Sequence, residues 1–364
     1  MGPRPAGTYR ALPRYDDPVT WTLRPEELPP SLLADLTGRP AASGPGSAGG
    51  DGGGATGRAT GPRVAAARRV DGGTWLEELP RRVADALERW DLRRDGSAPL
   101  RAGYNALVVP VLRPRGDAGA LKVGWPHPES DTEHLALRAW AGRGAVTLLA
   151  ADPAGSTLLL ERLDADRDLM TGSVLDTTEA LGHLVRALDR PAPPWAPRLS
   201  AQLDRVQQRL ARFQAEPGAA RQFPRRLVQH AASVVADLLA EGPDALDARL
   251  VHTDLHQMNV LWRPDPGEWV AIDPTPMAAD PHWAVAPALW NRWDDVLAAH
   301  DARAHLQLRL GILCEAAGLD EDRARAMTIV RQVDNAVWAI DADLSARIDW
   351  VSKAVAVVKA MQPG

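Results

Sequence analysis

The clearest indication of the fold is the run Leu250-Val251-His252-Thr253-Asp254-Leu255-His256-Gln257-Met258-Asn259-Val260-Leu261, with Val270-Ala271-Ile272-Asp273 close behind it. Short apolar runs lead into this loop, leave it, and end at Asp273. The residues between the last two runs include Pro264, Pro266 and Gly267, which mark a turn, so the runs predict two strands of a hairpin. Such a hairpin would bring Asn259 and Asp273 side by side.

The spacing His-x-Asp-x-x-x-x-Asn, followed by an aspartate at a strand end, is typical of the catalytic loop of protein-kinase-like phosphotransferases. Transfer of a γ-phosphoryl group passes through a loose transition state, so the protein mainly positions two oxygens and neutralises charge on the phosphates. We therefore expect Asp254 to accept the proton of the attacking hydroxyl. Asn259 and Asp273 are expected to hold Mg²⁺ against the phosphates of ATP, and His252 to fix the loop by packing.

Two other interpretations of this stretch stay open. The match could arise by chance, with Asp254 as a helix cap and Asn259 as a turn residue. Alternatively, two histidines spaced i, i+4 could form a zinc or di-metal hydrolase site with nearby acidic and imidazole side chains. The candidate ligands of that site are His252, His256, Asp254, Asp273, Asp280 and His282. The hydrolase interpretation leaves Asn259 without a role, and no second imidazole cluster follows in the sequence.

A single lysine suggests where the phosphates would bind. Lys122 is the only lysine before Lys353 and lies in an apolar Ala-Leu-Lys-Val run. A kinase needs an ammonium in its upper lobe to bind the α- and β-phosphates, whereas the alternative is a surface lysine on an edge strand. Glu133 opens the next helical run and could pair with Lys122. It is equally the N3 residue of a capping box that starts at Ser130.

Composition restricts the class of protein. The chain has 364 residues, 45% hydrophobic content and a formal net charge of −5, so there is no electrostatic case for nucleic acid. Cys314 is the only cysteine and is expected to be a small core residue. The sequence has neither a secretory segment nor an apolar run long enough to cross a membrane, so we expect a cytoplasmic protein with no membrane partner.

The chain divides into four parts by composition and pattern. We expect an N-terminal extension (1–37), a disordered insert rich in glycine, alanine and proline (38–73), a nucleotide-binding N-lobe (74–163) and a C-lobe that binds the acceptor and carries the catalytic loop (164–364). Strands are predicted at 104–112, 121–125, 147–149 and 157–160, and helices at 74–92, 134–141, 175–188, 199–213 and 225–239. The stretch from Glu161 to Leu163 is expected to be the hinge whose backbone groups face adenine.

The chain resembles the aminoglycoside phosphotransferase superfamily, and within it the branch of streptomycin 6-kinase and hydroxyurea phosphotransferase. The matching segments are Trp75-Leu76, 105–111, 120–123, 135–140, 158–163, the catalytic loop, 271–274, Asp280-Pro281 and 286–292. The resemblance implies an α+β, bilobal protein-kinase-like fold with a small β-rich N-lobe and a larger helical C-lobe. It also implies ATP and Mg²⁺ as cofactors and a hydroxyl group of a small molecule as phosphate acceptor.

Two features depart from that family, and the acceptor stays open. The glycine-rich insert is not a family feature, and Ala284 stands where many relatives carry an aspartate that supports the catalytic loop. The resemblance favours a streptomycin-like acceptor, with hydroxyurea, another metabolite, or a binding function without catalysis as alternatives. Acidic side chains that could suit a polycationic acceptor, or simply form a solvated surface, are Asp294, Asp295, Asp341 and Asp343.

Overall fold

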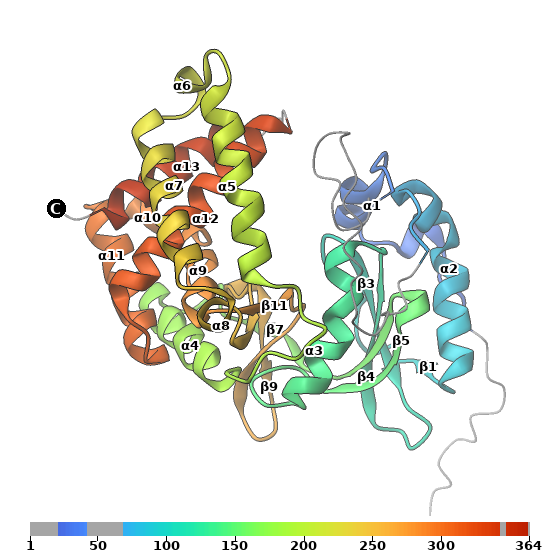
Figure 1. The fold of residues 1–364 in the computed structure, drawn as a ribbon. Coiled ribbons are helices and arrows are strands. Elements are labelled where there is room, and N and C mark those ends of the chain that lie inside the picture. Colours follow the sequence, from blue (N-terminus) through green and yellow to red (C-terminus); the bar gives the residue numbers. More distant parts are fainter. Residues whose placement is uncertain (1–20, 42–67, 343–346, 363–364) are drawn as a thin grey trace, which may run out of the picture.

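A computed structural model describes residues 21–41, 68–342 and 347–362 of the chain. Figure 1 shows two lobes: a smaller one built around a sheet and a larger one built mainly of helices. The predicted α+β, bilobal, kinase-like fold is confirmed. Most of the insert that was predicted to be disordered, residues 42–67, lies outside the described residues, as does Asp343.

The N-lobe sheet is antiparallel and has the strand order β1-β3-β4-β6-β5, with β2 also paired to β3. Its strands are β1 (Arg93–Arg94), β2 (Arg101–Ala102), β3 (Ala106–Leu112), β4 (Ala118–Gly124), β5 (Leu148–Asp152) and β6 (Thr157–Glu161). Both faces of the sheet are covered, which explains the continuous apolar run Leu158-Leu159-Leu160. Leu159 packs into the core on one face, while Leu158 and Leu160 pack into the core on the other.

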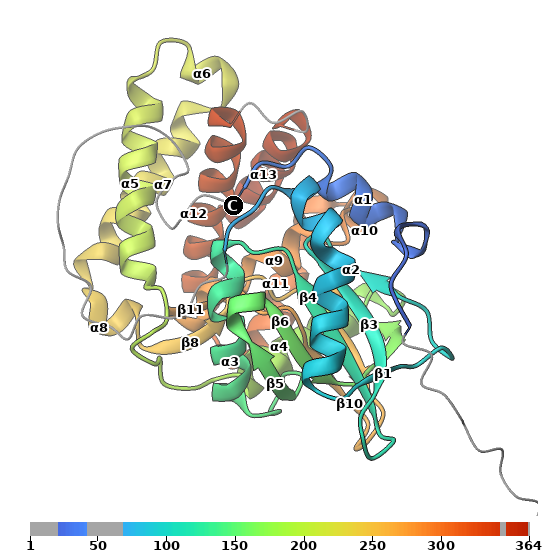
Figure 2. The same ribbon diagram turned by 90° about the vertical axis from the view of Figure 1, so that its right-hand side faces the viewer.

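Helices cover the two faces of this sheet. The helix α2 (Gly72–Arg89) lies across one face, as Figure 2 shows, and contributes Trp75, Leu79 and Val83 to the core. The short η2 (Pro128–Thr132) and α3 (Glu133–Trp140) follow β4, and α3 packs on the opposite face with Leu137 and Trp140. Lys122 pairs in register with Leu158, so its side chain points to the face that α3 covers.

Residues before the insert form part of the N-lobe core. The short elements η1 (Pro25–Glu27) and α1 (Pro30–Leu36) place four leucines in the same cluster as α2: Leu23, Leu28, Leu32 and Leu36. The backbone N–H of Gly72 donates to the carbonyl of Arg39 at 2.7 Å, and Val70 packs into the same core, so the segments on either side of residues 42–67 are tied together. In its packing, the described part of the predicted N-terminal extension belongs with the N-lobe.

The chain crosses between the lobes at the predicted hinge. The strand β6 ends at Glu161 in the N-lobe sheet, and β7 (Asp164–Asp168) pairs with β9 (Val260–Arg263) of the C-lobe. The strand β9 also pairs with β10 (Glu268–Ala271), which confirms the predicted hairpin. A second antiparallel strand pair, β8 (Arg249–His252) with β11 (Pro276–Ala279), leads directly into the catalytic loop at the end of β8.

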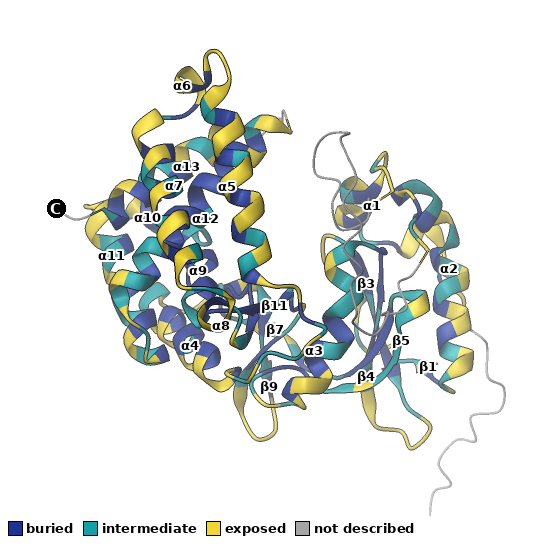
Figure 3. Ribbon diagram, viewed as in Figure 1, coloured by how far each residue is buried: buried dark blue, intermediate teal, exposed yellow. Residues whose placement is uncertain are grey.

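The C-lobe is a helical layer around one large core, with buried faces turned inward as Figure 3 shows. Its helical elements are α4 (Val174–Ala187), α5 (Leu199–Ala215), α6 (Ala219–Gln222), α7 (Arg225–Ala240), α8 (Pro243–Leu246), η4 (Gln257–Asn259), η5 (Pro281–Ala284), α9 (Ala286–Trp290), α10 (Trp293–Ala298), α11 (Ala302–Ala317), α12 (Glu321–Asp341) and α13 (Arg347–Met361). Gly182 allows α4 to approach α11 closely, because a Cβ atom there would lie 2.6 Å from the carbonyl oxygen of Leu313. No helix within the described ranges is long and apolar enough to cross a membrane.

Candidate active site

The catalytic loop begins where β8 ends. His252 is 1% exposed, and its Nδ1 accepts a hydrogen bond from the backbone N–H of Asp254 at 3.2 Å. Its Nε2 lies 3.2 Å from the carbonyl oxygen of Ile272, which assigns the ring proton to Nε2. Burial lowers the pKa of His252 to about 4, so the ring is neutral at physiological pH. This histidine joins the loop to the segment that follows β10 and leads to Asp273.

Asp254 is held by its neighbours in the loop. The amide Nδ2 of Asn259 donates to the backbone carbonyl of Asp254 at 2.9 Å and lies 3.3 Å from its Oδ2. The Nε2 of His256 is 3.5 Å from the same carboxylate oxygen. Burial alone would raise the pKa of Asp254, but the contact with His256 and the nearby positive charges outweigh burial, and the net pKa is lowered. The carboxylate is therefore ionised, and 47% of the side chain is exposed.

The hairpin places the two predicted metal ligands next to each other. The N–H of Ile272 donates to the carbonyl of Asn259 at 2.9 Å, directly after the last paired residues of β9 and β10. Asp273 adopts a left-handed backbone conformation with φ of 51°, which is uncommon for a residue other than glycine. Its side chain is 60% exposed and so accessible from the cleft.

One ammonium group connects the lobes. The Nζ of Lys122 lies 2.7 Å from Oε1 of Glu133 and 2.5 Å from Oδ1 of Asp273. Burial disfavours the charged lysine, but the two carboxylates outweigh burial and raise the pKa of Lys122. In return, the charge of Lys122 lowers the pKa of Asp273. Glu133 is the more enclosed partner, and burial raises its pKa.

The Lys122–Glu133 pair decides between the two interpretations of Glu133. Ser130 lies within η2, where its N–H is capped by Nδ1 of His127, and the N-cap of α3 is Thr132. The predicted capping box from Ser130 to Glu133 is therefore not formed, because Pro128 starts a separate helical turn. The carboxylate of Glu133 faces the lysine instead.

The predicted hinge contains Glu161 and Leu163. The carboxylate of Glu161 accepts hydrogen bonds from the backbone N–H of Thr147 at 2.6 Å and from Nη2 of Arg263 at 2.5 Å. Leu163 is 8% exposed and lies at the crossover between the two sheets. Arg263 also donates to carbonyl groups of Gly142 and Ala145, so it holds the hinge to both lobes.

The donor set fits magnesium better than zinc. Asp273 and Asn259 offer one carboxylate and one amide oxygen, and Mg²⁺ typically takes few protein ligands, with phosphates and water completing its shell. The groups that a hydrolase site would need are engaged in structural contacts: Asp280 binds His282 and Arg323, and both ring nitrogens of His252 hold the loop. No group of three or more His, Cys, Asp or Glu that could hold a metal ion is found in residues 21–41, 68–342 and 347–362.

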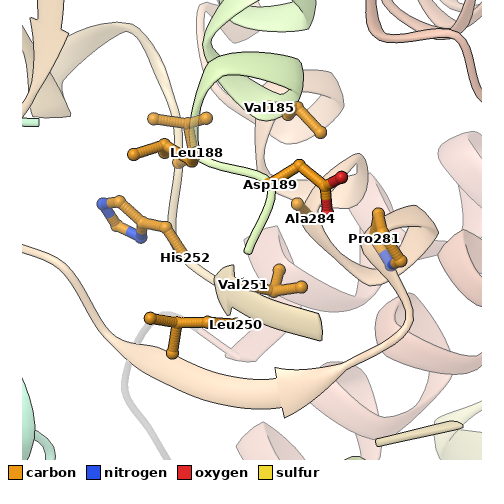
Figure 4. Close-up of a pocket in the computed structure, with 9 residues that line it drawn as sticks. Val185, Leu188, Asp189, Leu250, Val251, His252, Pro281 and Ala284 are labelled. Atoms are coloured by element: carbon orange, nitrogen blue, oxygen red, sulfur yellow. The ribbon is translucent and has the colours of Figure 1, made fainter. Parts of the chain in front are cut away.

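The segment around Ala284 lies behind the catalytic loop and presents apolar side chains to it. A cavity of about 10 Å³ lies between the end of α4 and β8, which is room for one water molecule. Figure 4 shows Val185, Leu188, Asp189, His252 and Ala284 around it. The carboxylate of Asp189 is bound to Arg249 at 2.6 Å and 2.7 Å. The loop therefore receives no carboxylate support from position 284.

Sequence reasoning missed one contact of the loop. Nη1 of Arg331, on α12, donates to the carbonyl oxygen of Thr253, the residue before Asp254, at 2.8 Å. An arginine in the middle of a helix far downstream belongs to no motif, so no local signal pointed to it. Glu129 was also missed: it precedes α3, and burial together with the charges of Asp254 and Asp273 raises its pKa.

Comparisons with known proteins assign the chain to a family. Residues 89–343 match the family model described as "Aminoglycoside/hydroxyurea antibiotic resistance kinase". The chain is 40% identical over 287 residues to a streptomycin 6-kinase from Streptomyces glaucescens, covering 77% of this chain and 88% of the relative. It is 40% identical over 277 residues to a hydroxyurea phosphotransferase from Kitasatospora aureofaciens, covering 74% of this chain and 76% of the relative.

A structure comparison gives a weaker match. The crystal structure of a macrolide 2′-phosphotransferase from Brachybacterium faecium aligns with a TM-score of 0.47 and 19% identity, covering 79% of this chain and 99% of that one. The sequence similarity is the stronger of the two findings. All seven residues that the sequence assigned to the site lie within the matched range 89–343.

Proposed function

Since the chain belongs to the aminoglycoside/hydroxyurea antibiotic resistance kinase family, we propose that it transfers the γ-phosphoryl group of ATP to a hydroxyl of a streptomycin-type aminoglycoside. The observation that carries the proposal is a chain of contacts between the expected phosphotransfer groups: Lys122 with Glu133 from the N-lobe, and Asp254, Asn259 and Asp273 from the C-lobe. The similarity to a streptomycin 6-kinase, of which the alignment covers 88%, supports the aminoglycoside as acceptor.

Asp254 is the residue that receives the acceptor hydroxyl. Its lowered pKa makes it a weak base, which suits a loose transition state in which the hydroxyl loses its proton late. Asn259 and His256 hold the carboxylate at one orientation. The main contribution of Asp254 is thus to aim the hydroxyl oxygen at phosphorus and to take up the proton at its Oδ atoms.

Lys122 supplies positive charge to the phosphates of ATP. In the structure its ammonium is shared by Glu133 and Asp273, so the incoming phosphates compete with Asp273 for it. Glu133 remains as the partner that keeps the lysine side chain extended across the cleft. Asp273 and Asn259 would hold Mg²⁺, which neutralises charge on the phosphates when it is bound. Backbone groups between Glu161 and Leu163 would contact adenine.

The acidic residues suggested for a cationic acceptor are only partly available. Asp295 is in an ion pair with Arg292 at 2.8 Å, which fixes the start of α10. Asp294 is exposed on the same helix. Burial raises the pKa of Asp341, which lies at the end of α12 beside the charges of Glu216 and Arg209. Of these, Asp294 and Asp341 remain as candidates for contact with a cationic acceptor.

The test is a panel of acceptors with the full-length protein, ATP and Mg²⁺. We expect streptomycin to gain one phosphoryl group by mass spectrometry, dependent on ATP, and hydroxyurea to gain none. Phosphoryl transfer to hydroxyurea alone would show that hydroxyurea, and not an aminoglycoside, is the acceptor. The similarity to the hydroxyurea phosphotransferase makes hydroxyurea the second candidate. As a control within the site, K122M should lower kcat/KM for ATP by about 10²-fold, because it removes a charge that acts on the phosphates.

A further inference from the structure

An arginine from α12 contacts two segments that meet under the catalytic loop. Nη1 of Arg331 donates to the carbonyl oxygens of Thr253 and Trp283, each at 2.8 Å. Thr253 belongs to the loop, and Trp283 belongs to η5. One guanidinium nitrogen therefore ties the residue before Asp254 to the turn that follows β11.

The guanidinium itself is held firmly. Its Cζ lies 5.2 Å from the ring centroid of Trp283 and 5.2 Å from that of Trp290, so two indole rings contact the cation. Burial lowers the pKa of Arg331 to about 10, which leaves the group charged at neutral pH. A planar guanidinium group that is packed between aromatic rings has little freedom to move.

The contact matters because of which peptide group it holds. The peptide unit between Thr253 and Asp254 presents its carbonyl oxygen to Arg331 and its N–H to Nδ1 of His252, at 2.8 Å and 3.2 Å. The preceding N–H, that of Thr253, donates to the carbonyl of Thr275 at 2.9 Å. The plane of the peptide that leads into Asp254 is thus fixed from both sides, and that plane sets the direction of the Asp254 side chain.

We propose that Arg331 is a positioning residue for phosphoryl transfer: by holding the Thr253 carbonyl, it keeps Asp254 aimed at the acceptor hydroxyl. The inference rests on the proposed function, since it assigns Asp254 as the group that meets the acceptor. Without Arg331, the Thr253–Asp254 peptide would keep only its His252 contact and could rotate about it. A displacement of about 1 Å at a reacting group can cost about 10²-fold in rate.

The chain offers a matched control in Arg309. This arginine is also buried in the C-lobe, where Nη2 donates to the carbonyls of Ala288 and, at 3.1 Å, Asn291. Burial lowers its pKa to about 10 as well. Both arginines therefore cross-link backbone segments, but Arg309 joins α11 to α9 and makes no hydrogen bond to the catalytic loop. Loss of general packing should affect the two alike.

The experiment compares R331M, R331K and R309M in the full-length protein with the acceptor that the wild type uses. We expect R331M to lower kcat by about 10²-fold with KM for ATP changed less than about threefold, and R331K to recover part of the loss. R309M should lower the melting temperature but leave kcat of the folded enzyme within about twofold. Equal losses of kcat in R331M and R309M at matched melting temperatures would overturn the proposal, as would full activity of R331M.

A second measurement keeps the inference separate from the proposed function. Hydrogen–deuterium exchange of the peptide that contains Asp254 should be faster in R331M and R331K than in the wild type, and unchanged in R309M, whatever the acceptor is. Unchanged exchange at Asp254 in both Arg331 variants would refute the positioning role even if no acceptor is found. A failure of the whole acceptor panel, with the exchange result as expected, would instead count against the aminoglycoside as substrate.

Discussion

The two lobes are built from the chain in different ways. The N-lobe core joins two stretches on either side of residues 42–67, because leucines of residues 23–36 pack against α2 and the sheet. The C-lobe core is made by the chain after the hinge, together with α3 and the inner face of the sheet. The lobe that holds Lys122 thus depends on residues before position 89, where the family match begins, whereas the transfer loop lies inside the match.

This difference predicts that substitutions in the two lobes impair the enzyme in different ways. Changes in the C-lobe loop should stop phosphoryl transfer while the fold and the nucleotide site persist. Changes in the first stretch of the N-lobe should weaken the support of the Lys122 strand while the transfer groups stay in place.

The largest effect is expected at Asp254. We proposed that its carboxylate acts on the acceptor hydroxyl and not on ATP, so D254N should lower kcat by at least about 10³-fold and leave Mg²⁺-nucleotide affinity within a few-fold. Steady-state kinetics and calorimetric nucleotide titration measure the two quantities. D273N is the contrasting variant and should weaken nucleotide binding. Near-normal turnover of D254N would mean that another group receives the proton.

The next effect concerns the stability of the N-lobe. Leu36 is fully buried against α2, so L36A should lower the free energy of unfolding by about 3 kcal/mol through lost burial and the cavity left behind. Leu33 lies on the same helix and is 36% exposed, so L33A should cost less than about 1 kcal/mol. Denaturant unfolding followed by fluorescence distinguishes them. Equal effects would show that α1 is not an integral part of the N-lobe.

A smaller effect comes from the buried imidazole of the loop. His252 has an ordinary pKa near 6.5 when unfolded and a pKa of about 4 in the fold, so between these values the unfolded chain binds the extra proton. The free energy of unfolding should therefore be highest above pH 6.5 and fall by up to about 3 kcal/mol from this group as the pH drops toward 4. H252N should remove the part of this pH dependence of the free energy of unfolding that comes from His252. H183N, which changes an exposed histidine of α4, should leave the slope as in the wild type.

The smallest effect is expected from residues 42–67. Their flanks already meet in the hydrogen bond between Gly72 and Arg39, so replacing the segment by a short glycine-serine linker changes only a closure entropy that depends weakly on length. The melting temperature and kcat should stay within error of the wild type. A marked loss of either would show that the segment makes contacts that the rest of the protein needs.

The sequence revealed the parts of the site that are local. The loop from His252 to Asn259, the hairpin to Asp273 and the lysine strand each carry their own short pattern, whereas the contact between Lys122 and Asp273 is visible only in the structure. Arg331 could not be predicted, because its role depends on how α12 packs under the loop. The leucines of 23–36 were missed for a related reason: prolines break that segment into short turns, so its apolar spacing shows no sustained period.

The hydrogen bond between Gly72 and Arg39 makes the segment between them useful for protein engineering. Backbone groups 2.7 Å apart tie its two flanks, while Arg69 and Val70 already contact the lobe, so a graft should begin after residue 41 and end before residue 68. A fluorescent reporter or an affinity tag could be grafted there as a loop, with no need to redesign the termini. The enzyme would then carry its label on the N-lobe, far along the chain from the loop that is proposed to transfer phosphate.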